Sequence, residues 1–130
     1  MQNDRTTTIQ DLKTALAEFV QNRDWQKFHS PKNLAMSISI EAAELMELFQ
    51  WLAVEESLIA LKNNHTKKMA EKEIADILLY ILEFCNTTGI DLARATFAKL
   101  EENSKKYPVL VCRGKPHKYT RYRPKNKGTA

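Results

Sequence analysis

Two pairs of carboxylate residues are the part of this sequence best suited to chemistry: Glu41-Ala-Ala-Glu44 and Glu73-Ile-Ala-Asp76. In each pair the acidic residues are three positions apart, which on a helix places both side chains on one face, one turn apart. If the two helices pack side by side, four negative groups converge, and a bound cation is what relieves their repulsion. Carboxylate oxygens are hard ligands that suit Mg²⁺, or Mn²⁺ in its place, better than zinc. The pairs therefore predict a divalent-metal site built from four carboxylates.

The alternative for these pairs is an ordinary solvated helix face. Glu-x-x-Glu pairs are common there, where they support ion pairs with Lys or Arg one turn further along. Neither segment carries a Lys or Arg at that distance, and both are otherwise strongly apolar. Metal binding is therefore the preferred interpretation. Glu47 lies further from the polar strip, and Glu83 lies near Asp76 in angle around the helix but has no partner at the matching spacing. Both are interpreted as surface or interface charges.

The elements that must position these residues are predicted to be long helices. The chain has only three Gly and four Pro in 130 residues, and 43% of it is hydrophobic, which favours an all-α domain with a real core. Apolar residues recur with a helical period at about 8–22, 31–51, 67–86 and 92–106, and a short helix is expected near 55–61. We therefore expect an all-α, four-helix bundle-like fold. The second helix has apolar residues around most of its circumference, so it is expected to be buried almost all round.

Residues that favour helix ends stand at the expected boundaries. Short polar side chains accept hydrogen bonds from the free N–H groups of a first turn, and glycine adopts the left-handed conformation that ends many helices. These signals agree with the periodicity. The residues expected to cap or end the helices are Thr8 with Asp11, Ser30 before Pro31, Gly89 and Asp91.

Three aromatic residues lie close to the polar strips in the sequence: Trp25, Trp51 and Tyr80. Two interpretations remain open for them, as core residues or as a stacking site for a planar base. His29, in the same polar segment as Trp25, is either a ligand or base, or a loop residue that makes a hydrogen bond, which is the commoner role. Because no Glu-x-x-His spacing is present, the di-iron site of bundle proteins is not predicted.

A polar stripe is also expected on the last long helix. Lys99, Asn103 and Lys106 fall within about 60° of one another around the helix axis. Such a stripe is either a hydrated helix face or a surface that meets phosphate oxygens. The pattern alone leaves both interpretations open.

Basic residues are concentrated at the end of the chain. Seven of the 20 Lys and Arg residues lie in residues 113–130, which contain no acidic residue, so thirteen basic and 16 acidic residues leave residues 1–112 with a net charge of −3. We expect residues 1–112 to form the folded domain and residues 113–130 a basic, partly disordered extension, preceded by an extended segment at 109–111. The extension is interpreted as solvated or as docked on a neighbouring subunit, because it carries no recognisable nucleic-acid-binding module.

The sequence also predicts a cytoplasmic setting. No window has the length of a membrane span, and the N-terminal residues lack the apolar core of a signal peptide. Cys85 and Cys112 have neither the spacing of a disulfide framework nor that of a metal site. No membrane partner is expected.

The carboxylate pairs and several longer segments resemble the MazG-like family of all-α nucleoside triphosphate pyrophosphohydrolases, whose motif is E-x-x-E followed by E-x-x-D. The resemblance covers about residues 9–120 and is strongest to the dCTP pyrophosphatase branch. The segments that carry it are RDWQKFHSPKNL (23–34), ELFQW (47–51), DILLY (76–80), GIDL (89–92), KLEENSKKYP (99–108), Arg113-Gly114 and KYT (118–120).

The resemblance implies Mg²⁺-dependent hydrolysis of a nucleoside triphosphate between its α and β phosphates, as a house-cleaning reaction on dCTP or a modified dCTP. It implies a homodimer or a homotetramer formed as a dimer of dimers, with sites at subunit interfaces. It also implies roles for particular residues. These are Glu41, Glu44, Glu73 and Asp76 at the metal and the attacking water; Trp25, Trp51 and Tyr80 around the base; His29 and Asn33 near the nucleotide; and Lys99, Asn103 and Tyr107 on the phosphates.

One position departs from the branch and leaves the base preference open. Some members have a histidine in the first helix that reaches the base pocket, and Leu16 stands there in this chain. Two rival functions are a non-catalytic helical module that binds nucleic acid through the basic tail, and a catalytically idle nucleotide-binding relative. The first predicts salt-sensitive binding without turnover, and the four intact carboxylates argue against the second.

Overall fold

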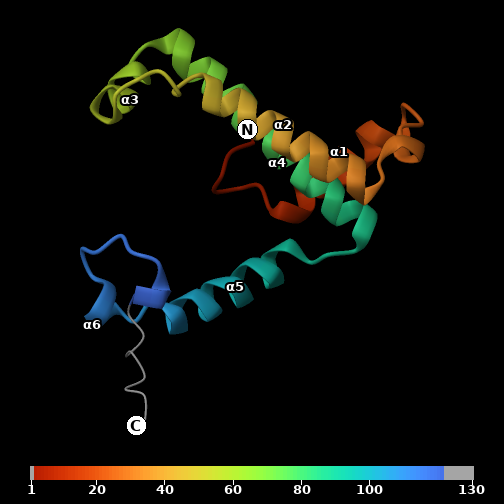
Figure 1. Cartoon of the computed structure of the whole chain (residues 1–130). Coiled ribbons are helices and arrows are strands. Elements are labelled where there is room, and N and C mark those ends of the chain that lie inside the picture. Colours follow the sequence, from red (N-terminus) through yellow and green to blue (C-terminus); the bar gives the residue numbers. More distant parts are fainter. Residues whose placement is uncertain (1, 122–130) are drawn as a thin grey trace. The chain divides into compact units, whose positions relative to one another are not determined.

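A computed structural model of the chain describes residues 2–121 and contains only helical elements in that range (Figure 1). The all-α prediction is therefore confirmed. Among residues 2–121, no helix combines the length and the apolar composition that a membrane span requires. The elements are α1 (Ile9–Gln21), η1 (Gln26–Phe28), α2 (Pro31–Glu47), α3 (Val54–Ala60), α4 (Asn64–Thr88), α5 (Leu92–Lys106), α6 (Val109–Cys112) and η2 (Tyr119–Arg121).

The chain divides into two compact units, Met1–Ile90 and Asp91–Ala130, which are described separately. The first unit holds three of the four long helices, and the second holds α5 and α6. The boundary expected after residue 112 stays a prediction. The basic residues Arg123, Lys125 and Lys127 lie outside the part of the chain that the structure describes.

The core of the first unit lies where α4 meets two other helices. α2 packs along α4, and α1 contacts α4 as well (Figure 1). Each of the three helices contributes to the small group of fully covered side chains, because each presents an apolar stripe to its neighbours. The buried apolar residues are Val20, Leu34, Ala70, Leu82 and Cys85.

The expected helix caps are confirmed. The Thr8 side chain accepts a hydrogen bond from the Asp11 N–H (3.1 Å), and the Asp11 carboxylate accepts one from the Thr8 N–H (2.8 Å). Ser30 caps α2 through the N–H of Asn33 (3.2 Å). Gly89 ends α4 with φ of 72°, a conformation that disfavours residues with a Cβ. Asp91 caps α5 through the N–H of Arg94 (2.9 Å).

Four expectations about the helices are wrong. α2 ends at Glu47 rather than near residue 51, and it is not buried all round: Leu34 is its one fully buried residue, while Met36 and Ile40 are more than half exposed. α4 begins at Asn64, before the expected residue 67, because the Asn63 side chain accepts hydrogen bonds from the first free N–H groups. Segment 109–111 is helical, since the carbonyl of the preceding proline accepts hydrogen bonds from the N–H groups of residues 111 and 112.

Candidate active site

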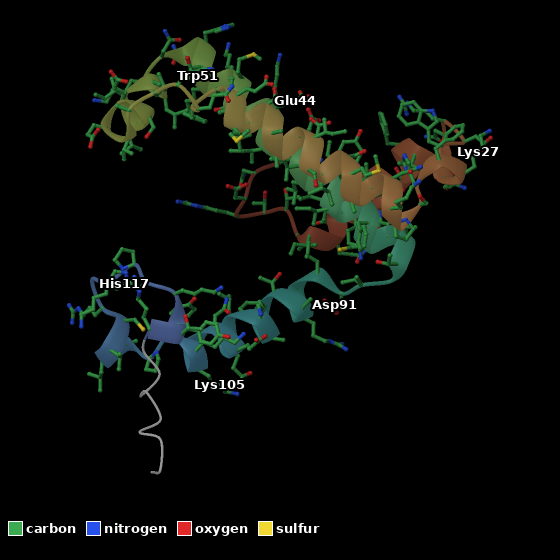
Figure 2. The ribbon with its side chains drawn as sticks, viewed as in Figure 1. Lys27, Glu44, Trp51, Asp91, Lys105 and His117 are labelled. Atoms are coloured by element: carbon green, nitrogen blue, oxygen red, sulfur yellow. The ribbon has the colours of Figure 1, made fainter. Side chains whose placement is uncertain are left out.

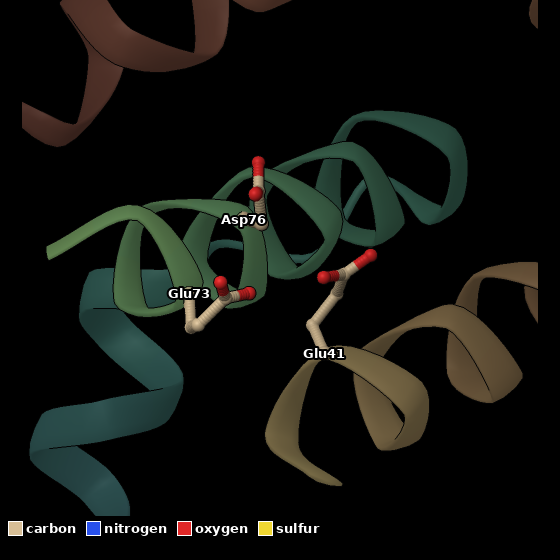
Figure 3. A group of neighbouring side chains, drawn as sticks. All are labelled: Glu41, Glu73 and Asp76. Atoms are coloured by element: carbon tan, nitrogen blue, oxygen red, sulfur yellow. The ribbon is translucent and has the colours of Figure 1, made fainter. Parts of the chain in front are cut away.

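Three carboxylates converge where α2 faces α4. Glu41 of α2 lies opposite Glu73 and Asp76 of α4, and each residue offers one oxygen within 4.8 Å of the others (Figure 3). Glu41 and Glu73 are half-buried, and Asp76 is exposed. The E-x-x-D spacing puts Glu73 and Asp76 one turn apart on α4, and the packing of α2 along α4 brings Glu41 to them. Oxygens around a six-coordinate Mg²⁺ lie roughly 3 to 4 Å apart, so small side-chain rotations would bring these three oxygens to the spacing of such an ion.

Within the part of the chain that the structure describes, no basic side chain balances the charge of the cluster. Among residues 2–121, no ion pair involves Glu41, Glu44, Glu73 or Asp76. The pKa of the Glu41 carboxyl is raised above its ordinary value, first by loss of solvent and then by the negative charges of Glu44, Asp76 and Glu73. A divalent cation supplies what this cluster lacks, and the residues present therefore fit such an ion.

The raised pKa of Glu41 predicts how the stability of the metal-free protein depends on pH. The folded chain holds the Glu41 proton more tightly than the unfolded chain, so this group contributes less stability as pH rises above its ordinary value of 4.5. Glu41→Gln removes the titration. In EDTA, the melting temperature of Glu41→Gln relative to the wild type should therefore rise between pH 4.5 and neutrality. A difference that stays constant or shrinks over this range contradicts the assignment.

A pocket of about 300 Å³ adjoins the carboxylates within the first unit. It brings together five of the residues expected at the site, from the loop before α2, from α2 itself and from α4: Trp25, His29, Glu41, Asp76 and Tyr80. One wall is apolar, and Glu83 also lines the pocket. The apolar residues are Leu16, Phe19, Val20 and Leu79. The pocket therefore joins metal-type ligands to aromatic rings of the kind that stack on a base.

The loop that carries Trp25 and His29 is held against α1. The Trp25 N–H donates to the Val20 carbonyl (3.2 Å), and the Trp25 ring packs edge-on against Phe19 with centroids 5.8 Å apart. Asn33, which was expected near the nucleotide, does not line the pocket. Its side-chain amide donates to the carbonyl of Phe28 (3.1 Å), so it fixes the end of this loop.

Glu83 is not the surface or interface charge that its spacing indicated. Its residue is 6% exposed, and its Oε1 lies 2.8 Å from Nδ1 of His29. The expectation failed because the packing of the loop onto α4 covers this position, which the sequence around it does not reveal. A signal was present: residues 73, 76, 80 and 83 follow the spacing of one helix face.

Besides Asn33, two expected residues of the first unit lie apart from the cluster and the pocket. Glu44 is exposed on α2 (Figure 2), one turn after Glu41. It acts on Glu41 through its charge without joining the three converging oxygens. Trp51 lies beyond the end of α2 and is 88% exposed. Neither residue lines the pocket.

The expected phosphate-binding residues belong to the second unit. On α5, Lys99 (2.9 Å) and Lys106 both pair with Glu102, which lowers the pKa of the Glu102 carboxyl to about 2. Asn103 is half-buried on the same helix, and Tyr107 packs edge-on against Tyr119 with ring centroids 6.2 Å apart. The two lysines thus have a carboxylate partner that the sequence stripe did not include.

Comparison with known proteins places this arrangement in a family. The family model described as the MazG-like family matches residues 36–120, which is more than half of the chain and includes both carboxylate pairs. The chain belongs to the MazG-like family. The resemblance drawn from the sequence is therefore confirmed.

Relatives of this MazG-like chain extend the match. It is 36% identical over 113 residues to dCTP pyrophosphatase 1 of Bos taurus, covering 87% of this chain and 67% of that protein. It is 33% identical over 113 residues to dCTP pyrophosphatase 1 of Homo sapiens, covering 87% of this chain and 66% of that protein. The chain thus spans about two thirds of the length of these relatives.

A solved structure matches the fold of this MazG-like chain. The crystal structure of a pyrophosphatase from Archaeoglobus fulgidus superposes with a TM-score of 0.73 at 41% sequence identity. The match covers 83% of this chain and 99% of that chain. The enzyme class expected from the sequence is thus the one that the names of the relatives and of the solved structure carry.

Proposed function

We propose that this MazG-like protein is a divalent-metal-dependent nucleoside triphosphate pyrophosphohydrolase acting on dCTP or a modified dCTP, in the house-cleaning of nucleotide pools. One observation supports it above the others: Glu41 and Asp76 line the same pocket as Trp25 and Tyr80. Carboxylates that would hold a metal ion, next to aromatic rings, suit the phosphates and the base of one nucleotide. The names of the curated relatives, dCTP pyrophosphatase 1, support the choice of base.

In the proposed reaction a water oxygen attacks the α-phosphorus and the bond from that phosphorus to the bridging oxygen of the β-phosphate breaks. The products are the nucleoside monophosphate and pyrophosphate. Glu41, Glu73 and Asp76 would hold the ion, joined by Glu44 from the next turn of α2. When bound, Mg²⁺ neutralises phosphate charge and favours deprotonation of water. One carboxylate of the set accepts the proton of the attacking water, while Trp25 and Tyr80 stack on the base.

The remaining expected residues complete the proposal. The exposed ring of Trp51 would cover the base in a site shared with a second copy of the chain, in a homodimer or homotetramer. Lys99, Asn103 and Tyr107 would contact phosphate oxygens. Lys99 would leave its ion pair with Glu102 and pair with a phosphate of the substrate instead. Asn33 would act by holding the loop that carries His29. We also propose a cytoplasmic location.

The test is a panel of canonical and modified NTPs and dNTPs assayed for pyrophosphate release with Mg²⁺ and with EDTA. We expect turnover of dCTP or a modified dCTP that stops in EDTA. Release of single phosphates, or turnover unaffected by EDTA, contradicts the proposal. Salt-sensitive nucleic-acid binding without turnover is the outcome expected for a module that acts through its basic tail, and the relatives do not favour it.

A further inference from the structure

His29 and Glu83 form a hydrogen-bonded pair in the pocket wall that the proposed metal chemistry does not use. Nδ1 of His29 lies 2.8 Å from Oε1 of Glu83, and 18% and 7% of the two side chains are exposed. A carboxylate covered to this degree costs free energy unless a donor satisfies it. The His29 ring supplies that donor.

The chemistry of the pair selects one form of the His29 ring. An ionised carboxylate only accepts hydrogen bonds, so the shared hydrogen belongs to Nδ1. In a neutral imidazole one nitrogen donates and the other accepts, and a hydrogen on Nδ1 leaves Nε2 with a free lone pair. When the ring is neutral, Glu83 therefore holds His29 in the tautomer whose Nε2 is an acceptor, as the partners of metal-bound histidines fix theirs.

Both partners are held in place by the elements that carry them. The His29 N–H donates to the Gln26 carbonyl (3.1 Å), and the neighbouring Phe28 carbonyl is held by Asn33 (3.1 Å). Glu83 follows Leu82, which is 1% exposed in the core. His29 is thus held by a hydrogen-bonded loop, and Glu83 is held by a helix that packs in the core.

Few groups that line the pocket could accept a hydrogen bond from the edge of a base. The wall from α1 is apolar and is formed by Leu16, Phe19 and Val20. Glu41 and Asp76 are assigned to the ion. Two other polar groups of the lining are set aside, because Glu83 is already paired and the Trp25 indole N–H only donates. The remaining polar groups that line the pocket are the His29 ring and the Tyr80 hydroxyl.

We propose that Glu83 is a positioning residue for base selection, which acts by making Nε2 of His29 an acceptor for an exocyclic amino group of the base. The inference rests on the proposed nucleotide hydrolysis. Cytosine has an amino group at C4, where uracil has a carbonyl oxygen. A fixed acceptor therefore favours cytosine and leaves two acceptors facing each other when uracil is bound.

The test compares dCTP with dUTP in the Glu83→Gln variant of the full chain. Gln has the same shape, but its amide can donate to Nδ1 as well as accept from it, so both His29 tautomers become available. We expect the dCTP-to-dUTP ratio of kcat/KM to fall about tenfold, through a higher KM for dCTP with kcat changed less than about twofold. Glu71→Gln, the same change at an exposed position of α4, should leave the ratio unchanged.

A second variant and a second readout separate base selection from general damage. His29→Gln keeps a donor for Glu83 and removes the ring, and it should lower the same ratio, with no further fall in the double variant. Nitrogen-15 NMR of the three histidines, His29, His65 and His117, reports the tautomer without substrate. The Nδ1–H form of His29 is expected in the wild type and its partial loss in Glu83→Gln.

The outcomes are distinguishable. An unchanged ratio in folded Glu83→Gln, or an Nε2–H tautomer in the wild type, overturns the role of Glu83 while leaving nucleotide hydrolysis standing. A fall in kcat alone, equal for dCTP and dUTP, also overturns it. A wild type that releases no pyrophosphate from any nucleotide refutes the proposed function, and base selection with it.

Discussion

Asp76→Asn is expected to lower the rate of pyrophosphate release by at least about a hundredfold in a protein that remains folded. Asp76 contributes one of the three converging oxygens (Figure 3). Asn has the same shape but no charge, and one of its two terminal atoms is a donor, so it is a poor ligand for a hard cation. Asp76 is exposed, and among residues 2–121 it has no ion pair that the fold would lose. Pyrophosphate release measured over a Mg²⁺ titration checks this.

A matched control separates the ligand from the charge. Asp91→Asn makes the same chemical change at the cap of α5, where Asn caps equally well, and it should keep full activity. Glu44→Gln should be inactive like Asp76→Asn, because we propose that Glu44 joins the ligand set. Full activity with an unchanged Mg²⁺ dependence in both Glu44→Gln and Asp76→Asn would falsify the proposed carboxylate site.

Leu34→Ala should destabilise the fold by about 2–5 kcal/mol, a large share of the stability of a domain of this size. Leu34 is 1% exposed and is the fully buried residue of α2, the helix that carries Glu41 to α4. Truncation leaves a cavity between the helices that bear the two halves of the carboxylate cluster. Urea or thermal unfolding followed by circular dichroism measures the change.

The control is the same substitution where no cavity can form. Leu110 is 100% exposed, so Leu110→Ala should change the free energy of unfolding by less than about 0.5 kcal/mol. Similar losses at Leu34 and Leu110 contradict the assignment of the core. Saturating Mg²⁺ should partly restore the stability of Leu34→Ala, because an ion that binds only the folded chain favours that state.

The sequence predicted what depends on local chemistry. Caps such as Thr8 and Asp91 act within one turn, and the three-residue spacing of Glu73 and Asp76 fixes their common face whatever packs against it. The all-α class, the convergence of three of the four carboxylates and the family followed from such signals.

What the sequence did not reveal depends on which surfaces meet. The apolar circumference of α2 indicated burial all round, yet residues such as Met46 are more than half exposed in the single chain. Glu83 has no local feature that marks it as buried, because the loop that covers it begins some sixty residues earlier in the chain. The partner of Lys99 and Lys106 was missed because the stripe was defined without the acidic residues beside it.

The position of the site on α4 limits how this protein can change in evolution. Asp76, Tyr80 and Glu83 stand on one uninterrupted helix, and the rise from Asp76 to Glu83 is about 10 Å along its axis. One residue inserted between them would turn the later side chains by about 100° away from the pocket. Insertions and deletions should therefore be excluded from this stretch, while point substitutions at pocket-wall positions such as Leu16 remain free to change the preferred base.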